Sequence, residues 1–236
     1  MLRFILILLL PSLLAGCAGQ EIQRKDGSKS AREFALSSLA KSDIDSVTEF
    51  SQKEAVKSLR LLTEKLYKRN PREFRKGGHE SAEAATAKLF DSLVNWQESP
   101  LGRSNWEDNF KLAFQEDHSG DRVHTFMGAL TAMILASYNH KTTFFVVDEL
   151  SAQKLYNSAR NIESAVWKLS TAKLSTGEKT LVTNSIEGDL QNLSFEREFG
   201  KLVAIQDLMA LLIEDKSNRA ISRVFQGVAS FVFLPI

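Results

Sequence analysis

The polar stretch from Glu116 to His124 gathers the side chains best suited to bind a metal ion. It places His118 and His124 among three carboxylates, and Asp121 lies between the two histidines. A transition-metal site needs such groups to converge, and calcium loops have a different spacing. Neither an HExxH nor an EF-hand sequence is present. The alternative is a polar loop in which Gly120 turns the chain and Asp121 caps the next helix, so that no cofactor is expected.

The most basic stretch runs from Tyr67 to Lys76, where five of ten residues are Lys or Arg. These cations are Lys68, Arg69, Arg72, Arg75 and Lys76. One interpretation is contact with an anionic partner, such as a phosphate group or a glycan polymer. The other is a solvated helix end, since cations are favoured at the C-terminus of a helix.

The sequence lacks the patterns typical of common catalytic sites. There is no GxSxG, SxxK, Walker, GxGxxG or zinc-protease pattern. Carboxylates are plentiful, but no spacing singles out a catalytic pair of the kind that glycosidases use. The sequence therefore favours a protein that is not an enzyme, and a cell-wall-acting enzyme is the less favoured alternative.

The first seventeen residues have the order of a secretory signal. A charged start at Arg3 is followed by an apolar run, and Leu14, Ala15, Gly16 and Cys17 close it. The apolar run is shorter than the roughly 20 residues that span a bilayer. Cys17 is also the one cysteine in 236 residues. This ending resembles the lipobox of bacterial lipoproteins, which implies a signal peptide of residues 1–16, cleavage before Cys17 and acylation of that cysteine.

The same resemblance implies a location in the cell envelope. In this family, an aspartate directly after the cysteine favours retention in the inner membrane. Ala18 stands at that position here, which favours the periplasmic face of the outer membrane. An acylated Cys17 leaves the chain without a free thiol, which suits an oxidising periplasm. Residues 17–30 are therefore expected to comprise a lipidated cysteine and a flexible tether. The tether is predicted because this segment includes Gly19 and Gly27 and shows no apolar periodicity.

Residues 31–236 are predicted to form a single helical domain. The whole chain has 43% hydrophobic and 25% charged residues, which is ordinary for a folded soluble protein. Without Arg3 of the signal, 29 basic residues balance 29 acidic residues. This balance lacks the basic excess of a nucleic-acid binder, so no nucleic acid is expected as a partner.

Apolar residues recur at helical spacing through most of this domain, and the fold class predicted is all-α. The architecture expected is an irregular bundle of about seven to nine helices. The helices expected cover residues 32–40, 43–70, 80–96, 104–114, 121–138, 151–171, 178–188 and 194–213, before a last apolar piece at 221–234. Thr142–Val147 and Thr180–Thr183 resemble strands. We expect irregular or helical structure at both, with a minor β-hairpin as the alternative.

Three features of the apolar pattern carry further expectations. The helix at 121–138 is apolar on nearly all sides, which predicts a central, buried position. In the first long helix, Val47 and Phe50 are assigned to the inward stripe that continues through Ala55. In the last long helix, Leu208, Leu211 and Ile213 widen the apolar face, which predicts packing on more than one side.

These observations predict a membrane-anchored periplasmic protein that acts as an interaction or scaffold component of the envelope. Its expected partners are the membrane, through the lipid anchor, and an envelope protein. The alternative is a carrier or sensor that binds an apolar ligand between helices. Such a ligand is expected near Val123–Tyr138, where small residues leave room for a cavity.

Overall fold

The structure is a computed structural model that describes residues 27, 41–91, 105–145, 148–184, 186–187 and 190–217. For residues 186–187, 190–191 and 217 it describes the backbone alone. The predicted signal peptide, Cys17 and the expected helical or apolar segments 32–40 and 221–234 lie outside these residues. The helices described below belong to one compact unit that begins at Lys41.

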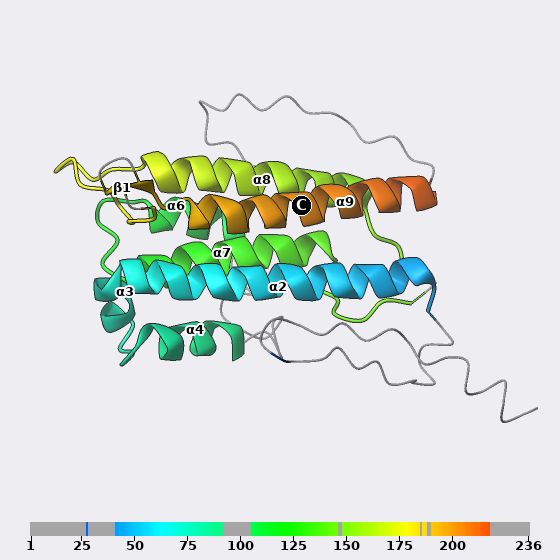
Figure 1. Cartoon of the computed structure of the whole chain (residues 1–236), viewed down its shortest axis with the longest axis horizontal. Coiled ribbons are helices and arrows are strands. Elements are labelled where there is room, and N and C mark those ends of the chain that lie inside the picture. The colour runs from blue at the N-terminus through cyan, green and yellow to red at the C-terminus, as the bar shows by residue number, and fades with distance from the viewer. Residues whose placement is uncertain are drawn as a thin grey trace, which may run out of the picture. The chain divides into compact units, whose positions relative to one another are not determined.

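The described part of the chain is a bundle of α-helices, which confirms the predicted all-α class. Seven helices lie in it: α2 (Asp43–Arg69), α3 (Pro71–Lys76), α4 (Ala82–Asp91), α6 (Trp106–Ala113), α7 (Arg122–Ser137), α8 (Ala152–Thr171) and α9 (Ser194–Ser217). The four long helices α2, α7, α8 and α9 run side by side, and α4 lies along α2 (Figure 1). Among the described residues, no helix is long and apolar enough to cross a membrane.

Local capping signals set the ends of α2. Ser42 Oγ accepts a hydrogen bond from the backbone N–H of Asp45, and Asp45 Oδ2 accepts one from the backbone N–H of Ser42. This reciprocal pair is a capping box. At the other end Asn70 is the C-cap, and Pro71 begins α3, because the missing N–H of proline is tolerated in the first turn of a helix.

Helix α7 is the central helix, as its all-round apolar pattern predicted. Thirteen of its sixteen residues are buried. Its neighbours are α2, α3, α4, α6 and α8. The large side chains of Phe126, Met127, Leu130 and Met133 are fully buried in the same core as Leu59 and Leu62 of α2.

A buried polar network joins α7 to α8 and α9. Gln206 Oε1 accepts a hydrogen bond of 2.8 Å from the hydroxyl of Tyr138. Gln206 Nε2 donates to Ser137 Oγ at 2.9 Å and to Ser158 Oγ at 2.8 Å. A buried network whose polar atoms all have partners specifies one register of packing, because any shift would leave buried groups without hydrogen bonds.

The segment after α8 corrects one sequence-based prediction. The helix expected at 178–188 is wrong, because residues 178–184 are irregular and Ile186–Glu187 is a short strand, β1. Strand β1 pairs in antiparallel fashion with β2 (Leu190–Gln191). A tight turn precedes them, in which Gly177 adopts a positive φ of 85° and the backbone N–H of Thr180 donates to Ala172 O. These turns divert the chain before a helix can continue.

The described parts of the two strand-like segments do not form a hairpin. Residues 142–145 and 180–183 have no regular secondary structure, as the first expectation stated, and residues 146–147 lie outside the described part. The pairing of β1 with β2 shows that a minor hairpin exists, at a different place from the one considered.

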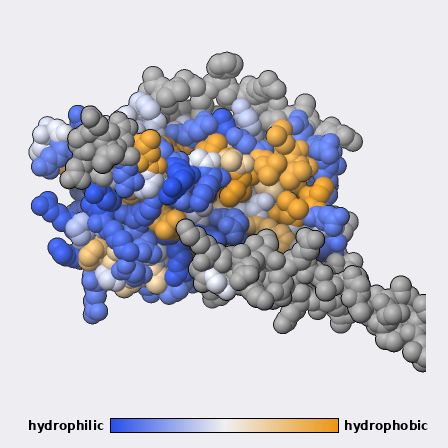
Figure 2. Space-filling view, in the orientation of Figure 1, coloured by the Kyte–Doolittle hydropathy of each residue, from blue (hydrophilic) through white to orange (hydrophobic). Residues whose placement is uncertain are grey.

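The apolar faces of α2 and α9 also differ from the prediction. Val47 and Phe50 are exposed, and so are Leu208 and Leu211. The buried stripe of α2 runs back from Ala55 through Gln52 to Thr48 at helical spacing, so Val47 and Phe50 fall outside it. Figure 2 shows hydrophobic side chains gathered on one face, over the half of the bundle where the start of α2 and the end of α9 lie.

Candidate functional site

The structure brings together the two polar stretches that the sequence singled out. They meet where the end of α2 and α3 pack against the N-terminus of α7. Tyr67, near the end of α2, donates a hydrogen bond of 2.8 Å from its hydroxyl to Asp121 Oδ2. Glu73 of α3 accepts a hydrogen bond of 2.7 Å through Oε2 from the backbone N–H of Arg122. Residues about fifty positions apart thus form one polar cluster.

Both carboxylates of this cluster stabilise the N-terminus of α7. Asp121 is the N-cap, as predicted, and its Oδ1 accepts a hydrogen bond of 2.9 Å from the backbone N–H of His124. Glu73 binds the N–H of the first helical residue. Negative charge at this position is favoured by the helix dipole and by the unpaired N–H groups of the first turn.

Burial shifts the pKa values of Asp121 and Tyr67. Burial raises the pKa of Asp121, and the charge of Glu73 raises it further, while hydrogen bonds from His124 N–H and the Tyr67 hydroxyl lower it. Burial and the nearby Asp121 raise the pKa of Tyr67 above its usual range, so its hydroxyl stays a donor. Asp121 and Glu73 are only 9% and 8% exposed, so a substrate in solution has little access to either carboxylate.

The buried guanidinium of Arg122 binds the C-terminal end of α6, the helix before α7. Arg122 is 5% exposed, and its Nη1 donates to Ala113 O at 2.8 Å, at the end of α6. Its Nη2 donates to Glu116 O at 3.2 Å. A cation that binds carbonyls at a helix C-terminus is favourable for the same reason that an anion is favourable at an N-terminus.

The predicted metal candidates make hydrogen bonds within the protein. His118 Nε2 lies 3.2 Å from Thr125 Oγ1, while Asp121 binds Tyr67 and the start of α7. Burial lowers the pKa of His118, and the charges of Arg122 and Lys76 lower it further. Burial also lowers the pKa of His124, with a further contribution from His79. Within the described residues, no group of three or more His, Cys, Asp or Glu side chains could hold a metal ion.

Three of the five cations of the basic stretch bind other groups of the protein. Lys68 forms ion pairs with Glu64 and Glu83. Arg69 Nε donates to Thr183 O at 3.0 Å. Lys76 Nζ lies 2.8 Å from Glu73 Oε1.

The other two cations of that stretch, Arg72 and Arg75, remain on the outer surface. Both are exposed, and among the described residues no carboxylate forms an ion pair with either. The guanidinium of Arg75 lies 5.6 Å from the ring centroid of Phe74. They stand three residues apart on α3 and so share one face of that helix.

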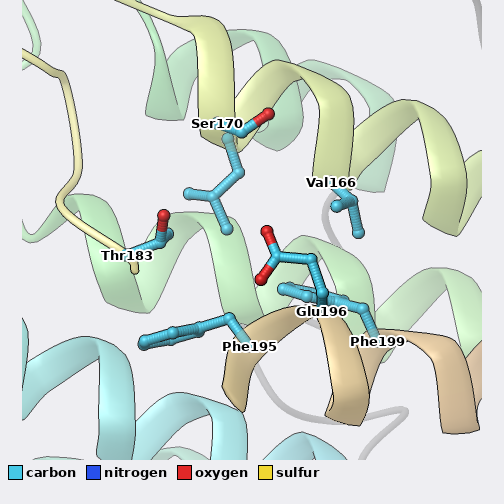
Figure 3. Close-up of a pocket in the computed structure, with 7 residues that line it drawn as sticks. Val166, Ser170, Thr183, Phe195, Glu196 and Phe199 are labelled. Carbon is cyan, nitrogen blue, oxygen red and sulfur yellow. The ribbon is translucent and has the colours of Figure 1, made fainter. Parts of the chain in front are cut away.

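A hollow in the described surface lies between the end of α8 and the start of α9. Its lining residues are Val166, Leu169, Ser170, Thr183, Phe195, Glu196 and Phe199. Figure 3 shows Val166 and Ser170 reaching it from α8, and Phe195, Glu196 and Phe199 from α9. The hollow leaves essentially no space for a water-sized molecule, whereas small-molecule sites begin at roughly 300 Å³. It also lies away from Val123–Tyr138, the segment considered for an apolar ligand.

Sequence reasoning missed two features of these surfaces. Glu73 stands in the middle of a basic run and reads as a solvated charge, yet it is buried against α7. The exposure of Val47 and Phe50 had a signal, because the spacing of five from Phe50 to Ala55 interrupts the helical period.

Comparison with known proteins adds no relative. No protein-family model, curated protein or solved structure matches this chain.

Proposed function

We propose that this chain is a lipid-anchored protein of the periplasm that serves as an interaction or scaffold component of the cell envelope. The observation that carries the proposal is the position of its one cysteine, directly after Leu14, Ala15 and Gly16 at the end of an apolar signal. Ala18 favours the outer membrane as the place of the anchor. The buried carboxylates and guanidinium of the candidate site bind the ends of helices. This structural role is consistent with a scaffold protein.

The surface proposed for an envelope partner is the outer face of α3. Arg72 and Arg75 present two guanidinium groups there, and guanidinium groups recognise carboxylates and phosphates through paired hydrogen bonds. Helix α2 has 27 residues and so carries the chain about 40 Å from Lys41 to α3. The proposed partner surface therefore lies at the end of α2 that is far from the entry of the tether.

Labelling with a palmitate analogue tests the anchor. Wild-type protein is expected to incorporate the label and to stay with the membranes after a high-salt wash. The variant Cys17→Ser is expected to lose the label and to accumulate with its signal uncleaved. A wild-type protein that is processed without incorporating lipid contradicts the anchor.

Crosslinking in cells, followed by purification and mass spectrometry, tests the scaffold function. Wild type is expected to capture one reproducible envelope protein, and Arg72→Glu with Arg75→Glu is expected to lose it while remaining membrane-bound. The matched control is Lys53→Glu with Lys57→Glu, which reverses two exposed charges on α2. Monomer without a reproducible partner contradicts the scaffold function, and equal loss in both variants contradicts its assignment to α3.

A further inference from the structure

The start of α2 and the end of α9 form one end of the bundle. The ion pair between Lys216 Nζ and Asp45 Oδ1, at 3.4 Å, joins the last turn of α9 to the first turn of α2. The hydrogen bond from Lys65 Nζ to Ser194 O joins the opposite ends of the same two helices. The helices are therefore antiparallel, and Val47 and Phe50 lie at the same end as Leu208 and Leu211.

Large apolar side chains are exposed at this end of the bundle. We call Val47, Phe50, Leu208 and Leu211 the outer apolar surface. Leu208 and Leu211 are 55% and 59% exposed, and Phe50 is 46% exposed. Eight large apolar side chains are exposed in the described part, and half of them belong to this surface. Figure 2 shows hydrophobic surface gathered over the half of the bundle in which this end lies. Such a concentration marks a surface that contacts a protein or a membrane.

The course of the chain distinguishes between those two partners. Ala40 is bonded to Lys41, so the segment from Cys17 enters the bundle directly before α2, whatever path residues 18–40 take. Val47 and Phe50 stand in the first turns of that helix. If Cys17 is acylated, the outer apolar surface is therefore at the end of the bundle that the anchor keeps nearest to the bilayer.

We propose that the outer apolar surface docks on the lipid bilayer in which the anchor is embedded. This inference rests on the lipid anchor of the proposed function. Leucine and phenylalanine side chains on a helix face enter the boundary between headgroups and acyl chains to a depth of about 5–10 Å. Docking adds a second attachment to the acylated cysteine and fixes the orientation of the bundle.

Fluorescence quenching in vesicles tests this docking. An acylated Cys17 has no free thiol, so Leu211→Cys in the mature lipidated protein supplies one site for an environment-sensitive probe. The matched control is Leu193→Cys, because Leu193 is 53% exposed and lies directly before the start of α9. Both proteins are reconstituted into vesicles of phosphatidylethanolamine and phosphatidylglycerol with brominated acyl chains.

The expected result is blue-shifted emission and several-fold stronger quenching at position 211 than at position 193. Equal, weak quenching at both positions overturns the inference. So does a blue shift at 211 without quenching, because another protein segment then covers the surface. A dimer seen by sedimentation, with the same unquenched probe, assigns the surface to a second copy and also overturns the inference.

Flotation of the same vesicles separates failure of the docking from failure of the anchor. Protein that floats with the vesicles but shows no quenching retains the anchor and loses the docking. Protein that carries no lipid and does not float contradicts the anchor itself.

Discussion

The hydroxyl of Tyr67 donates a 2.8 Å hydrogen bond to Asp121 Oδ2, which links the last turns of α2 to the N-cap of α7. Both residues are buried, and the bond spans 54 positions of sequence. This hydrogen bond joins the first long helix to the start of the central helix. Its removal should therefore affect the stability of the whole bundle.

The variant Tyr67→Phe is expected to lower the free energy of unfolding by about 1–3 kcal/mol, because it leaves a buried carboxylate without one of its donors. Urea denaturation measures this change. A double-mutant cycle with Asp121→Ala, which removes the acceptor oxygens, isolates the pair, and the two losses should not add. Additive losses would show that the two side chains do not stabilise each other.

Acidification is expected to destabilise the bundle through three histidines whose pKa values are lowered in the folded state. Burial is the main cause that lowers the pKa of His118, His124 and His140 below the ordinary value of 6.5. The unfolded chain therefore binds these protons at a higher pH than the folded chain. The stability from the neutral rings is complete above pH 6.5 and falls as the pH drops towards the lowered pKa values.

Asp121 acts in the opposite direction, because burial raises its pKa and its charge costs stability at neutral pH. Urea midpoints measured from about pH 7.5 down to about pH 5.5 test the balance. The triple variant His118→Gln, His124→Gln and His140→Gln should show a smaller loss than wild type over this range. An unchanged loss would assign the acid sensitivity to other groups.

The variant Gln206→Leu is expected to destabilise the protein by about 2–4 kcal/mol, because it leaves the buried Tyr138 hydroxyl and two serine hydroxyls short of partners. Thermal unfolding followed by circular dichroism measures the loss. The control Gln115→Leu changes an exposed glutamine and should shift stability by less than about 0.5 kcal/mol. A similar shift in both variants would contradict the role of the network.

Two leucines of α9 are expected to differ sharply in their contributions. Leu202→Ala should cost about 2–5 kcal/mol, because Leu202 is fully buried. Leu208→Ala should change the stability of the protein in solution by less than about 0.5 kcal/mol, because Leu208 is exposed. Chemical denaturation without lipid compares them, and equal costs would contradict the orientation of α9.

The ends of the helices could be predicted because their signals are local. Asn105, Asp121 and Ser151 each accept a hydrogen bond from a backbone N–H two or three residues further along, and the residue types alone indicate this. Helix α8 ends at Thr171, as its apolar spacing predicted. The prediction of a helix at 178–188 was wrong because an apolar pattern this short fits a helix and a pair of turns equally well.

The candidate site could be predicted only in its parts. The sequence indicated that Asp121 caps a helix and that the stretch around Lys76 is basic. It did not indicate that Tyr67 and Glu73 would meet the same helix end, since that depends on how α2 and α3 pack against α7. The exposure of Leu208 and Leu211 also depends on which sides of α9 have neighbours, and apolar composition does not specify this.

The continuous course of α2 also has a mechanical consequence. This helix has 27 residues. It runs from the point where the chain enters the bundle to α3, which carries the two arginines. Any tension between a membrane anchor and a partner bound at α3 would therefore act along the axis of this helix. Its packing against α4, α7 and α9 would be loaded in shear, with many contacts sharing the force at once. This packing would resist stretching between the proposed anchor and the proposed partner.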